Sequence, residues 1–392
     1  MRTSAAVFRP MANNRGMSAH DSITIPASLL PADGRFGAGP SRVRAAQIDA
    51  LSSLGSTLMG TSHRQAPVKQ EVKRLQNGLR QLFSLPDDYE VVLGNGGSTA
   101  FWDVAVSSLI EKRAQHVTVG EFSAKFANAS AAAPHLESPD IRSAQPGGLI
   151  HARAQGDVDA YAWAHNETST GVMAPVLRPD GARDSQLVLI DATSAAGGLP
   201  VDITESDVYY FAPQKSFASD GGLWIALASP SAVARAERIA SSGRWIPEFL
   251  SFTAALENSR KNQTLNTPAI ATIVLMAEQV DWMNENGGLD FCAERTRSAS
   301  AHLHTWAQQR DELSLFVQEP SHRSQVVTTI DVDESIDASA VVGIMRAHGV
   351  VDIDPYRKLG RNQLRIATFP ATPLEDVQAL TASLDYVFDR LS

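Results

Sequence analysis

The sequence contains a lysine whose surroundings suit nucleophilic chemistry. The apolar run at residues 207–213 ends at Gln214 and Lys215, and small residues follow as far as Gly222. An amine at the end of a buried strand is partly removed from water, which lowers its pKa and makes it a better nucleophile toward an aldehyde. Most lysines after a strand are ordinary surface residues, so this pattern has to be weighed together with others.

A carboxylate ends another apolar run, Leu187–Ile190, at Asp191. Burying a carboxylate is costly unless it has a positive partner. A protonated ring nitrogen of a cofactor at about 4 Å would contribute roughly 4 kcal/mol at an effective dielectric constant of about 20. An aspartate that caps the next helix is the alternative, and the sequence leaves both open. Asp191 and Lys215 are one strand–connection–strand unit apart, which predicts that they share one edge of a parallel sheet.

Two further strand ends carry polar residues. Gly94-Asn-Gly-Gly-Ser98-Thr99 is a glycine turn that opens onto a predicted helix, where free amide groups and two hydroxyls could cradle a phosphate. It lacks the lysine of a P-loop and the spacing of a dinucleotide fingerprint. The segment 163–168 places polar side chains after another apolar run. Ligands of open α/β sheets bind at the carboxyl ends of strands, so four such ends together favour one ligand site.

The elements that would position these residues form an α/β pattern. Strands are predicted at 91–93, 116–119, 158–164, 186–191, 207–212 and 223–228, and helices at 67–83 and 98–110. Continuous apolar runs indicate a mostly parallel sheet with helices on both faces. After about residue 285 the pattern changes to a smaller C-terminal α+β domain, with helices at 289–309 and 337–347 and strands at 325–332, 349–353 and 363–369.

We therefore predict four parts. They are a disordered tail (1–22), a segment that packs on the small domain (23–42), a large domain (43–285) and a small domain (286–392).

Composition limits the classes of function. A chain of 392 residues suits two domains, and a net charge of −9 argues against non-specific binding to nucleic acid or to an anionic membrane. Cys292 is the one cysteine, which excludes an internal disulfide and a cysteine-rich metal site, and no metal is expected. A reduced, cytoplasmic setting is the default. No apolar stretch is long enough to span a membrane.

The motifs together resemble the fold-type I pyridoxal-phosphate enzymes, and within them the phosphoserine aminotransferase family in its actinobacterial branch. The resemblance runs from about Phe36 to the C-terminus. The matching stretches are Gly37-Ala-Gly-Pro-Ser41, Gly60-Thr-Ser-His-Arg-Gln65, Gly94–Thr99, Gly120-Glu-Phe122, His165-Asn-Glu-Thr168, Ala212-Pro-Gln-Lys215, Leu265-Asn-Thr-Pro268 and Tyr356-Arg-Lys-Leu-Gly-Arg361.

The resemblance implies a role for each matching residue. It makes Lys215 the lysine that carries pyridoxal 5′-phosphate, Asp191 the partner of the ring nitrogen, and Phe122 the aromatic that stacks on the ring, where many relatives have Trp. The remaining cofactor contacts would be Ser98, Thr99 and Gln214 at the phosphate, Thr168 near the ring hydroxyl, and Asn266 and Thr267, which reach the neighbouring subunit's cofactor. A homodimer with shared sites is therefore expected.

The substrate contacts also follow from the resemblance. Arg365 would hold the α-carboxylate, and His63, Arg64 and Arg357 would surround a side-chain anion, because arginine suits both carboxylate and phosphate. The family often has His where Tyr356 stands, and two extra residues lie between Arg357 and Arg365. Lys358 or Arg361 could therefore share the phosphate.

The implied reaction is transamination between O-phospho-L-serine and 2-oxoglutarate, giving 3-phosphohydroxypyruvate and L-glutamate, in serine biosynthesis. The same site could accept the 4-phosphohydroxy-L-threonine of vitamin B6 biosynthesis. Alternatives are a cysteine desulfurase, an alanine–glyoxylate aminotransferase or a non-catalytic cofactor-binding protein. A desulfurase needs a reactive cysteine on a mobile loop, whereas Cys292 lies at helical spacing with Leu289, which predicts a core residue.

Overall fold

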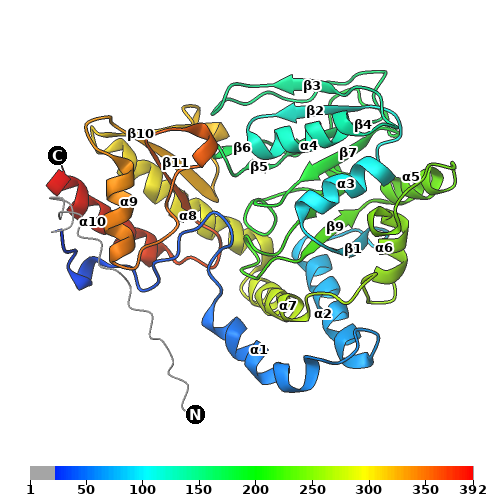
Figure 1. The fold of residues 1–392 in the computed structure, drawn as a ribbon, viewed down its shortest axis with the longest axis horizontal. Helices are drawn as coiled ribbons and strands as arrows, with labels where there is room; N and C mark the ends of the chain where they lie inside the picture. The colour runs from blue at the N-terminus through cyan, green and yellow to red at the C-terminus, as the bar shows by residue number, and fades with distance from the viewer. Residues whose placement is uncertain (1–22, 392) are drawn as a thin grey trace, which may run out of the picture.

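A seven-stranded sheet is the frame of the larger part of the molecule (Figure 1). A computed structural model describes residues 23–391, and the predicted tail, 1–22, lies outside them. Across the sheet the strands are β1 (Glu90–Asn95), β9 (Leu223–Ala228), β8 (Val208–Phe211), β7 (Leu187–Asp191), β4 (Ala160–Ala164), β2 (Ala114–Thr118) and β3 (Asp140–Ser143). β9 is antiparallel to both of its neighbours, and the other pairs are parallel. The predicted, mostly parallel sheet is confirmed.

Helices cover both faces of this sheet, because alternate strand residues point to opposite sides. Val188 and Ile190 of β7 belong to one hydrophobic cluster, together with α2 (Ala66–Leu82) and α7 (Ile270–Glu285). Leu187 and Leu189 belong to another, with α3 (Ser98–Ser108), α4 (Glu121–Ala132), α5 (Pro230–Ala240) and α6 (Phe252–Ser259). The strands are therefore buried on both faces, which explains the continuous apolar runs of the sequence as predicted. The first helix, α1 (Ala45–Leu58), packs on α7.

A second, smaller unit follows α7. Its antiparallel sheet has the order β10 (Leu313–Leu315), β11 (Val327–Val332) and β12 (Gln363–Ala367). Three helices, α8 (Gly288–Gln308), α9 (Ala338–Ala347) and α10 (Leu374–Leu391), share a hydrophobic cluster with this sheet. Figure 1 shows the unit beside the large sheet. These contacts support the division that we propose near residue 285.

The predicted strand at 349–353 is wrong. Val351 makes only an isolated bridge, to Arg35. Gly349 and Asp352 have positive φ angles of 85° and 64°, which interrupt an extended backbone. The apolar residues of this segment have another cause: Val350 and Ile353 are buried in the core of the small unit.

The N-terminal segment touches both units. Ile25 and Phe36 are buried in the core of the small unit, and the backbone of Ala367 in β12 donates to the carbonyl of Phe36 at 3.0 Å. The chain then crosses to the large sheet, where the amide of Ser41 donates to the carbonyl of Gln214 at 2.9 Å. Residues 37–41 therefore lie over the end of β8.

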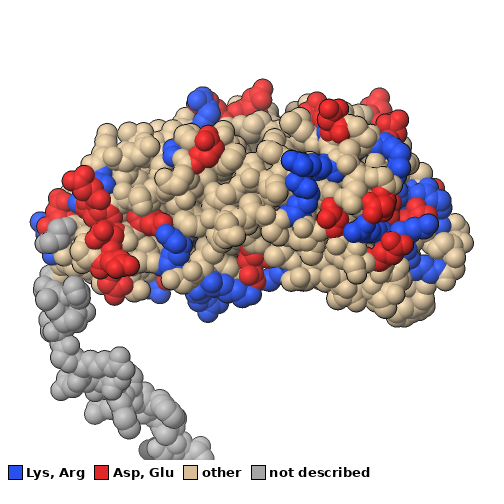
Figure 2. All heavy atoms as spheres, turned by 90° about the horizontal axis from the view of Figure 1, so that it is seen from above, with Lys and Arg blue, Asp and Glu red and all other residues tan. Residues whose placement is uncertain are grey.

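Short elements complete the described chain. They are the two-stranded hairpin of β5 (Asn166–Glu167) and β6 (Val172–Met173) and the 3-10 helices η2 (Ala27–Leu29), η3 (Ile203–Glu205), η4 (Glu248–Leu250), η5 (Pro320–His322) and η6 (Arg357–Leu359). No helix within residues 23–391 is long and apolar enough to cross a membrane. Figure 2 shows acidic and basic side chains interspersed over one face, without a large area of a single sign.

Candidate functional site

The carboxyl ends of β1, β4, β7 and β8 meet at one edge of the large sheet, because these strands run in the same direction. Ser98 follows β1, Asp191 ends β7 and Lys215 follows β8. The edge thus brings together the glycine turn, the carboxylate and the lysine, which were predicted from separate parts of the sequence. Open α/β sheets bind their ligands at such an edge.

Lys215 is half-buried, and its amine donates a hydrogen bond to the carbonyl of Ala38. Removal of the ammonium from water and, to a smaller extent, the positive charge of Arg365 lower the pKa of Lys215 to about 8, against the opposing effect of Asp191. A substantial fraction of the amine is therefore neutral near physiological pH, which is the state required of a nucleophile.

The N-terminal segment closes over this amine. A Cβ placed on Gly39 would lie 2.1 Å from Nζ of Lys215, so a side chain at that position would displace the amine. The hydroxyl of Ser41 donates to the carbonyl of Lys215 at 2.6 Å. The sequence identified the stretch 37–41 only through the resemblance, and its contact with the lysine is a feature of the tertiary structure.

Asp191 is 6% exposed and accepts hydrogen bonds on both oxygens. Oδ1 accepts from the amide and hydroxyl of Thr193, at 3.0 and 2.5 Å, and Oδ2 accepts from the indole N–H of Trp102 at 3.0 Å. Within residues 23–391 no lysine, arginine or histidine forms an ion pair with it. A buried carboxylate held only by neutral donors is suited to a cationic group supplied by a ligand. Trp102 and Thr193 were not predicted as site residues.

The glycine turn opens onto α3 as predicted. The first hydrogen bond of the helix runs from the amide of Phe101 to the carbonyl of Gly97, so the amides of Ser98, Thr99 and Ala100 have no partner within the helix. The Ser98 side chain is half-buried and that of Thr99 is exposed. Free amides and hydroxyls at the start of a helix are suited to binding an anion.

Three further predicted contacts lie around the same edge. Phe122 is half-buried in the first turn of α4, and Thr168 is buried and donates to the hydroxyl of Ser194 at 2.8 Å. The side-chain oxygen of Gln214 is buried and has no hydrogen-bond partner in the described part of the chain. An unsatisfied buried amide next to Lys215 is consistent with a ligand that completes its hydrogen bonding.

Arg365 brings a cation from the small unit to this edge. Its Nη1 donates to the carbonyl of Thr168 at 3.3 Å, and its Nε is buried without a partner. It forms no ion pair with any residue in 23–391, and burial lowers the pKa of its guanidinium. An unpaired, half-buried guanidinium is a site for an anion, because arginine binds a carboxylate with two parallel hydrogen bonds.

A cleft of about 680 Å³ opens beside Arg365. It is lined by Arg346, Asp354, Pro355, Tyr356, Arg357, Lys358 and Arg365. Arg357 is exposed and has no carboxylate partner among the described residues. Tyr356 lies between the predicted ring-stacking residue and the cation: its ring centroid is 5.9 Å from that of Phe122 and 5.4 Å from the guanidinium carbon of Arg365.

The two cations that could have shared the phosphate are already engaged. Lys358 forms an ion pair with Glu121 at the start of α4. Arg361 donates twice to Asp331, at 2.9 and 2.6 Å. Arg357 therefore remains the available cation of this segment in the structure.

The remaining predicted contacts are His63, Arg64, Asn266 and Thr267. Nδ1 of His63 is 3.1 Å from the hydroxyl of Thr267. The side chain of Asn95 at the end of β1 bonds to the backbone of Asn266 and Thr267, at 3.3 and 3.1 Å. Arg64, Asn266 and Thr267 are exposed, and within residues 23–391 no hydrogen bond or ion pair joins this group to Arg357 or Arg365. The contacts of Asn95 place Asn266, Thr267 and His63 beside the end of β1, next to the glycine turn.

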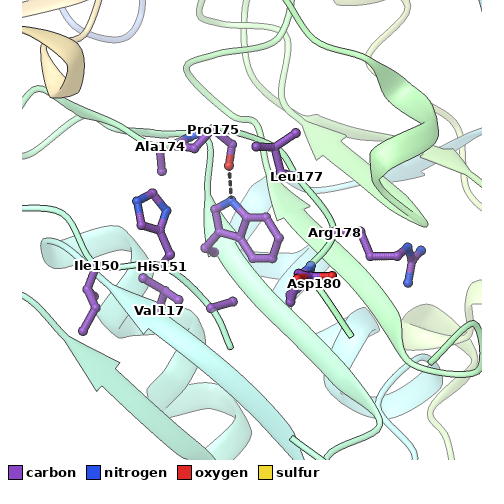
Figure 3. Close-up of a pocket in the computed structure, with 11 residues that line it drawn as sticks. Val117, Ile150, His151, Ala174, Pro175, Leu177, Arg178 and Asp180 are labelled. Atoms are coloured by element: carbon purple, nitrogen blue, oxygen red, sulfur yellow. Dashed lines mark hydrogen bonds between the residues drawn. The ribbon is translucent and has the colours of Figure 1, made fainter. Parts of the chain in front are cut away.

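Two other features lie apart from this site. A cavity of about 380 Å³ is walled by the indole of Trp163, whose N–H donates to the carbonyl of Pro175 at 3.1 Å, and none of its lining residues is a predicted site residue (Figure 3). Cys292 is fully buried in α8, and burial raises the pKa of its thiol to about 12. It is a core residue as predicted, which argues against a desulfurase.

Comparison with known proteins agrees with this geometry. The family model of aminotransferase class-V matches residues 36–352. The chain is 61% identical over 372 residues to the phosphoserine aminotransferase of a Nocardioides species, covering 95% of this chain and all of that protein.

Two solved structures share the fold. The phosphoserine aminotransferase of Cytophaga hutchinsonii has a TM-score of 0.83 at 23% identity, covering 90% of this chain and 99% of that one. The pyridoxal-phosphate-bound phosphoserine aminotransferase of Trichomonas vaginalis has a TM-score of 0.77 at 18% identity, covering 90% and 99%. With a family model that spans most of its length and a site built at the expected sheet edge, the chain belongs to the class-V aminotransferase family.

Proposed function

We propose that the protein is a pyridoxal-phosphate-dependent phosphoserine aminotransferase. It transfers the amino group of O-phospho-L-serine to 2-oxoglutarate, giving 3-phosphohydroxypyruvate and L-glutamate. One observation carries the proposal: the amine of Lys215, with its lowered pKa, lies at the same sheet edge as the buried carboxylate of Asp191 and the unpaired guanidinium of Arg365. The relative at 61% identity that is named phosphoserine aminotransferase supports the choice of substrate.

The residues present fit pyridoxal phosphate. The free amides and hydroxyls at the start of α3 suit its phosphate, and Asp191, which lacks a cationic partner in the described chain, suits a protonated ring nitrogen. Phe122 and Thr168 lie where they can contact the ring, and the unpaired side chain of Gln214 adds a further polar contact. When bound, the cofactor supplies an electron-accepting ring that stabilises negative charge at the α-carbon of an amino acid.

Lys215 has two tasks in this reaction. Its neutral amine would hold the cofactor through the cofactor's aldehyde group. When free, Nζ would accept the proton of the substrate's α-carbon as a general base and donate a proton as a general acid. The carbonyl of Ala38 accepts a hydrogen bond from this amine and holds it at the site when it is free. Gly39 leaves the space that this position requires.

The cations orient the substrate. Arg365 binds the α-carboxylate, and Arg357, across the cleft of about 680 Å³, contributes to binding of the side-chain phosphate. His63 and Arg64 would complete the phosphate site. His63 contacts Thr267, which is expected to reach the partner's cofactor, and we propose that His63 and Arg64 likewise act across a dimer interface.

A homodimer in the cytoplasm is part of the same proposal. The exposed Asn266 and Thr267 are the residues that would reach the partner's cofactor. Two large apolar side chains are also exposed, Ile48 in α1 at 50% and Met59 just after that helix at 47%. Exposed apolar residues of this size support contact with another surface.

A spectrum tests the function directly. The purified protein should show a visible cofactor band that changes on addition of O-phospho-L-serine or 4-phosphohydroxy-L-threonine, and much less on addition of alanine. Formation of glutamate from 2-oxoglutarate should follow the same order. A band that responds equally to alanine would reduce the proposal to an aminotransferase of unassigned specificity, and the absence of any cofactor band after incubation with pyridoxal phosphate would refute it.

A further inference from the structure

Helix α3 contacts the carboxylate of Asp191, and its first residues, Ser98 and Thr99, form the proposed phosphate cradle. Ser98 and Trp102 are four residues apart, so their side chains lie on the same face of the helix, one turn apart. Trp102 bonds directly to Oδ2 of Asp191 at 3.0 Å. The hydroxyl of Ser98 is 2.5 Å from that of Thr193, which in turn is 2.5 Å from Oδ1 of Asp191. Both oxygens of the carboxylate are therefore tied to this helix.

The direction of these hydrogen bonds follows from the number of protons. Oδ1 of the ionised carboxylate can only accept, so Thr193 donates its single hydroxyl proton to Asp191. The oxygen of Thr193 must then accept the proton of Ser98. The relay runs from Ser98 through Thr193 to Asp191, and any phosphate oxygen at the cradle would compete with Thr193 for the Ser98 proton.

We propose that Thr193 and Trp102 are positioning residues through which α3 fixes Asp191 relative to the phosphate cradle. This inference rests on the proposed function. One rigid helix then sets the spacing between the group that holds the cofactor phosphate and the group that holds the ring nitrogen. Binding at one end of the cofactor is consequently coupled to the hydrogen bonding of the carboxylate at the other end.

Three substitutions separate this role from a purely structural one. Thr193→Val removes the hydroxyl and keeps the shape, Thr193→Ser restores a hydroxyl, and Trp102→Phe removes the N–H while keeping an aromatic ring beside Phe126, whose ring centroid is 6.4 Å from that of Trp102. Thr296→Val is the matched control, because Thr296 is fully buried and donates to the carbonyl of Gly198, away from Asp191.

The measurement is the dissociation constant of the apoprotein for two probes, followed by the visible absorbance of the bound cofactor or by the quenching of protein fluorescence. The probes are pyridoxal phosphate and its 1-deaza analogue, in which a C–H group replaces the ring nitrogen. Thr193→Val and Trp102→Phe should raise the dissociation constant for pyridoxal phosphate by roughly 10- to 100-fold, which corresponds to the loss of one hydrogen bond to a charged group. The affinity for the deaza analogue, which makes no ion pair with Asp191, should fall much less in these variants. Thr193→Ser should bind pyridoxal phosphate nearly as tightly as the parent does.

The relay through Ser98 has its own test. The effects of Ser98→Ala and Thr193→Val on pyridoxal phosphate affinity should be non-additive in the double variant, because the two hydroxyls form one chain. Equal losses for both probes, no loss in Thr193→Val and Trp102→Phe, or a comparable loss in Thr296→Val would overturn the inference. A parent protein that binds neither probe would instead overturn the proposed function, so the two failures are distinguishable.

Discussion

A Cβ on Gly39 would lie 2.1 Å from the amine nitrogen of Lys215, so the N-terminal segment and the lysine fit each other without space for a side chain. Gly39 also has a φ of 133°, which few other residues adopt. Gly39→Ala should therefore displace the amine and reduce turnover by about 100-fold or more, as misplacement of a reacting group by about 1 Å does.

The control for this variant is Gly243→Ala. Gly243 also has a positive φ, of 85°, but nothing lies within 4 Å of its added Cβ. Backbone strain alone would therefore affect both variants, whereas loss of activity should be confined to Gly39→Ala. Equal steady-state rates in the two variants, measured with O-phospho-L-serine, would contradict the assigned contact.

Lys215→Ala should abolish transamination while leaving the fold intact. In the proposed function this amine bonds to the cofactor and moves the α-proton, so its loss would remove both steps. Circular dichroism should match the parent, and borohydride treatment in the presence of pyridoxal phosphate should no longer attach the cofactor to the protein. Retention of near-normal turnover would show that another residue does this work.

The pH dependence of Lys215 should respond in opposite directions to two neighbouring substitutions. The amine, with its pKa lowered to about 8, is neutral and reactive above that pH and protonated below it, so the rate of cofactor attachment to apoprotein should rise through about pH 8. Arg365→Leu removes a charge that disfavours the ammonium, which raises the pKa and moves the midpoint to higher pH. Asp191→Asn removes a charge that favours it and moves the midpoint lower. Stopped-flow absorbance across pH measures both, and shifts of the same sign would contradict this electrostatic account.

Asp191→Asn should still bind pyridoxal phosphate but turn over more slowly by orders of magnitude. The amide keeps the hydrogen-bonding shape and loses the negative charge that, in the proposed function, keeps the ring nitrogen protonated. Single-turnover kinetics with O-phospho-L-serine give the rate. A rate within a few-fold of the parent would leave Asp191 as a cap of its own turn, the role that its bonds from Thr193 alone would imply.

Arg64→Ala should change substrate preference. If Arg64 binds the side-chain phosphate, its loss should cost about 2–4 kcal/mol, the worth of one or two charge-assisted hydrogen bonds, or roughly 30- to 1,000-fold in kcat/KM for O-phospho-L-serine. The constant for glutamate should fall too, and that for alanine should not. Arg297→Ala, which removes an exposed arginine paired with Glu294, is the control. An unchanged ratio of O-phospho-L-serine to alanine would make Arg64 structural.

Light scattering tests the shared site. The protein should be a dimer at assay concentration. Thr267→Ala should weaken binding of the cofactor without dissociating the dimer, since Thr267 would contact the cofactor of the neighbouring subunit. An active monomer would contradict both statements and would require His63 and Arg64 to reach the cleft within one chain.

The sequence by itself determined the strand ends. Apolar runs that stop at Asp191 and Lys215, and the glycine turn before Ser98, predict a parallel sheet and place three groups on one edge, because chain direction and strand ends are local properties of the sequence. Burial of Cys292 followed equally from its helical spacing.

Contacts between distant segments were decided only by the tertiary structure. Ala38 and Gly39 meet Lys215, Trp102 meets Asp191 and Arg365 meets Thr168 through the packing of whole elements, which no local pattern encodes. The same holds for Lys358 and Arg361, which look like free cations in the sequence and find Glu121 and Asp331 in the fold. The strand expected at 349–353 is wrong for a related reason: its apolar residues are buried in the core of the small unit, while positive φ angles at Gly349 and Asp352 interrupt the extended backbone.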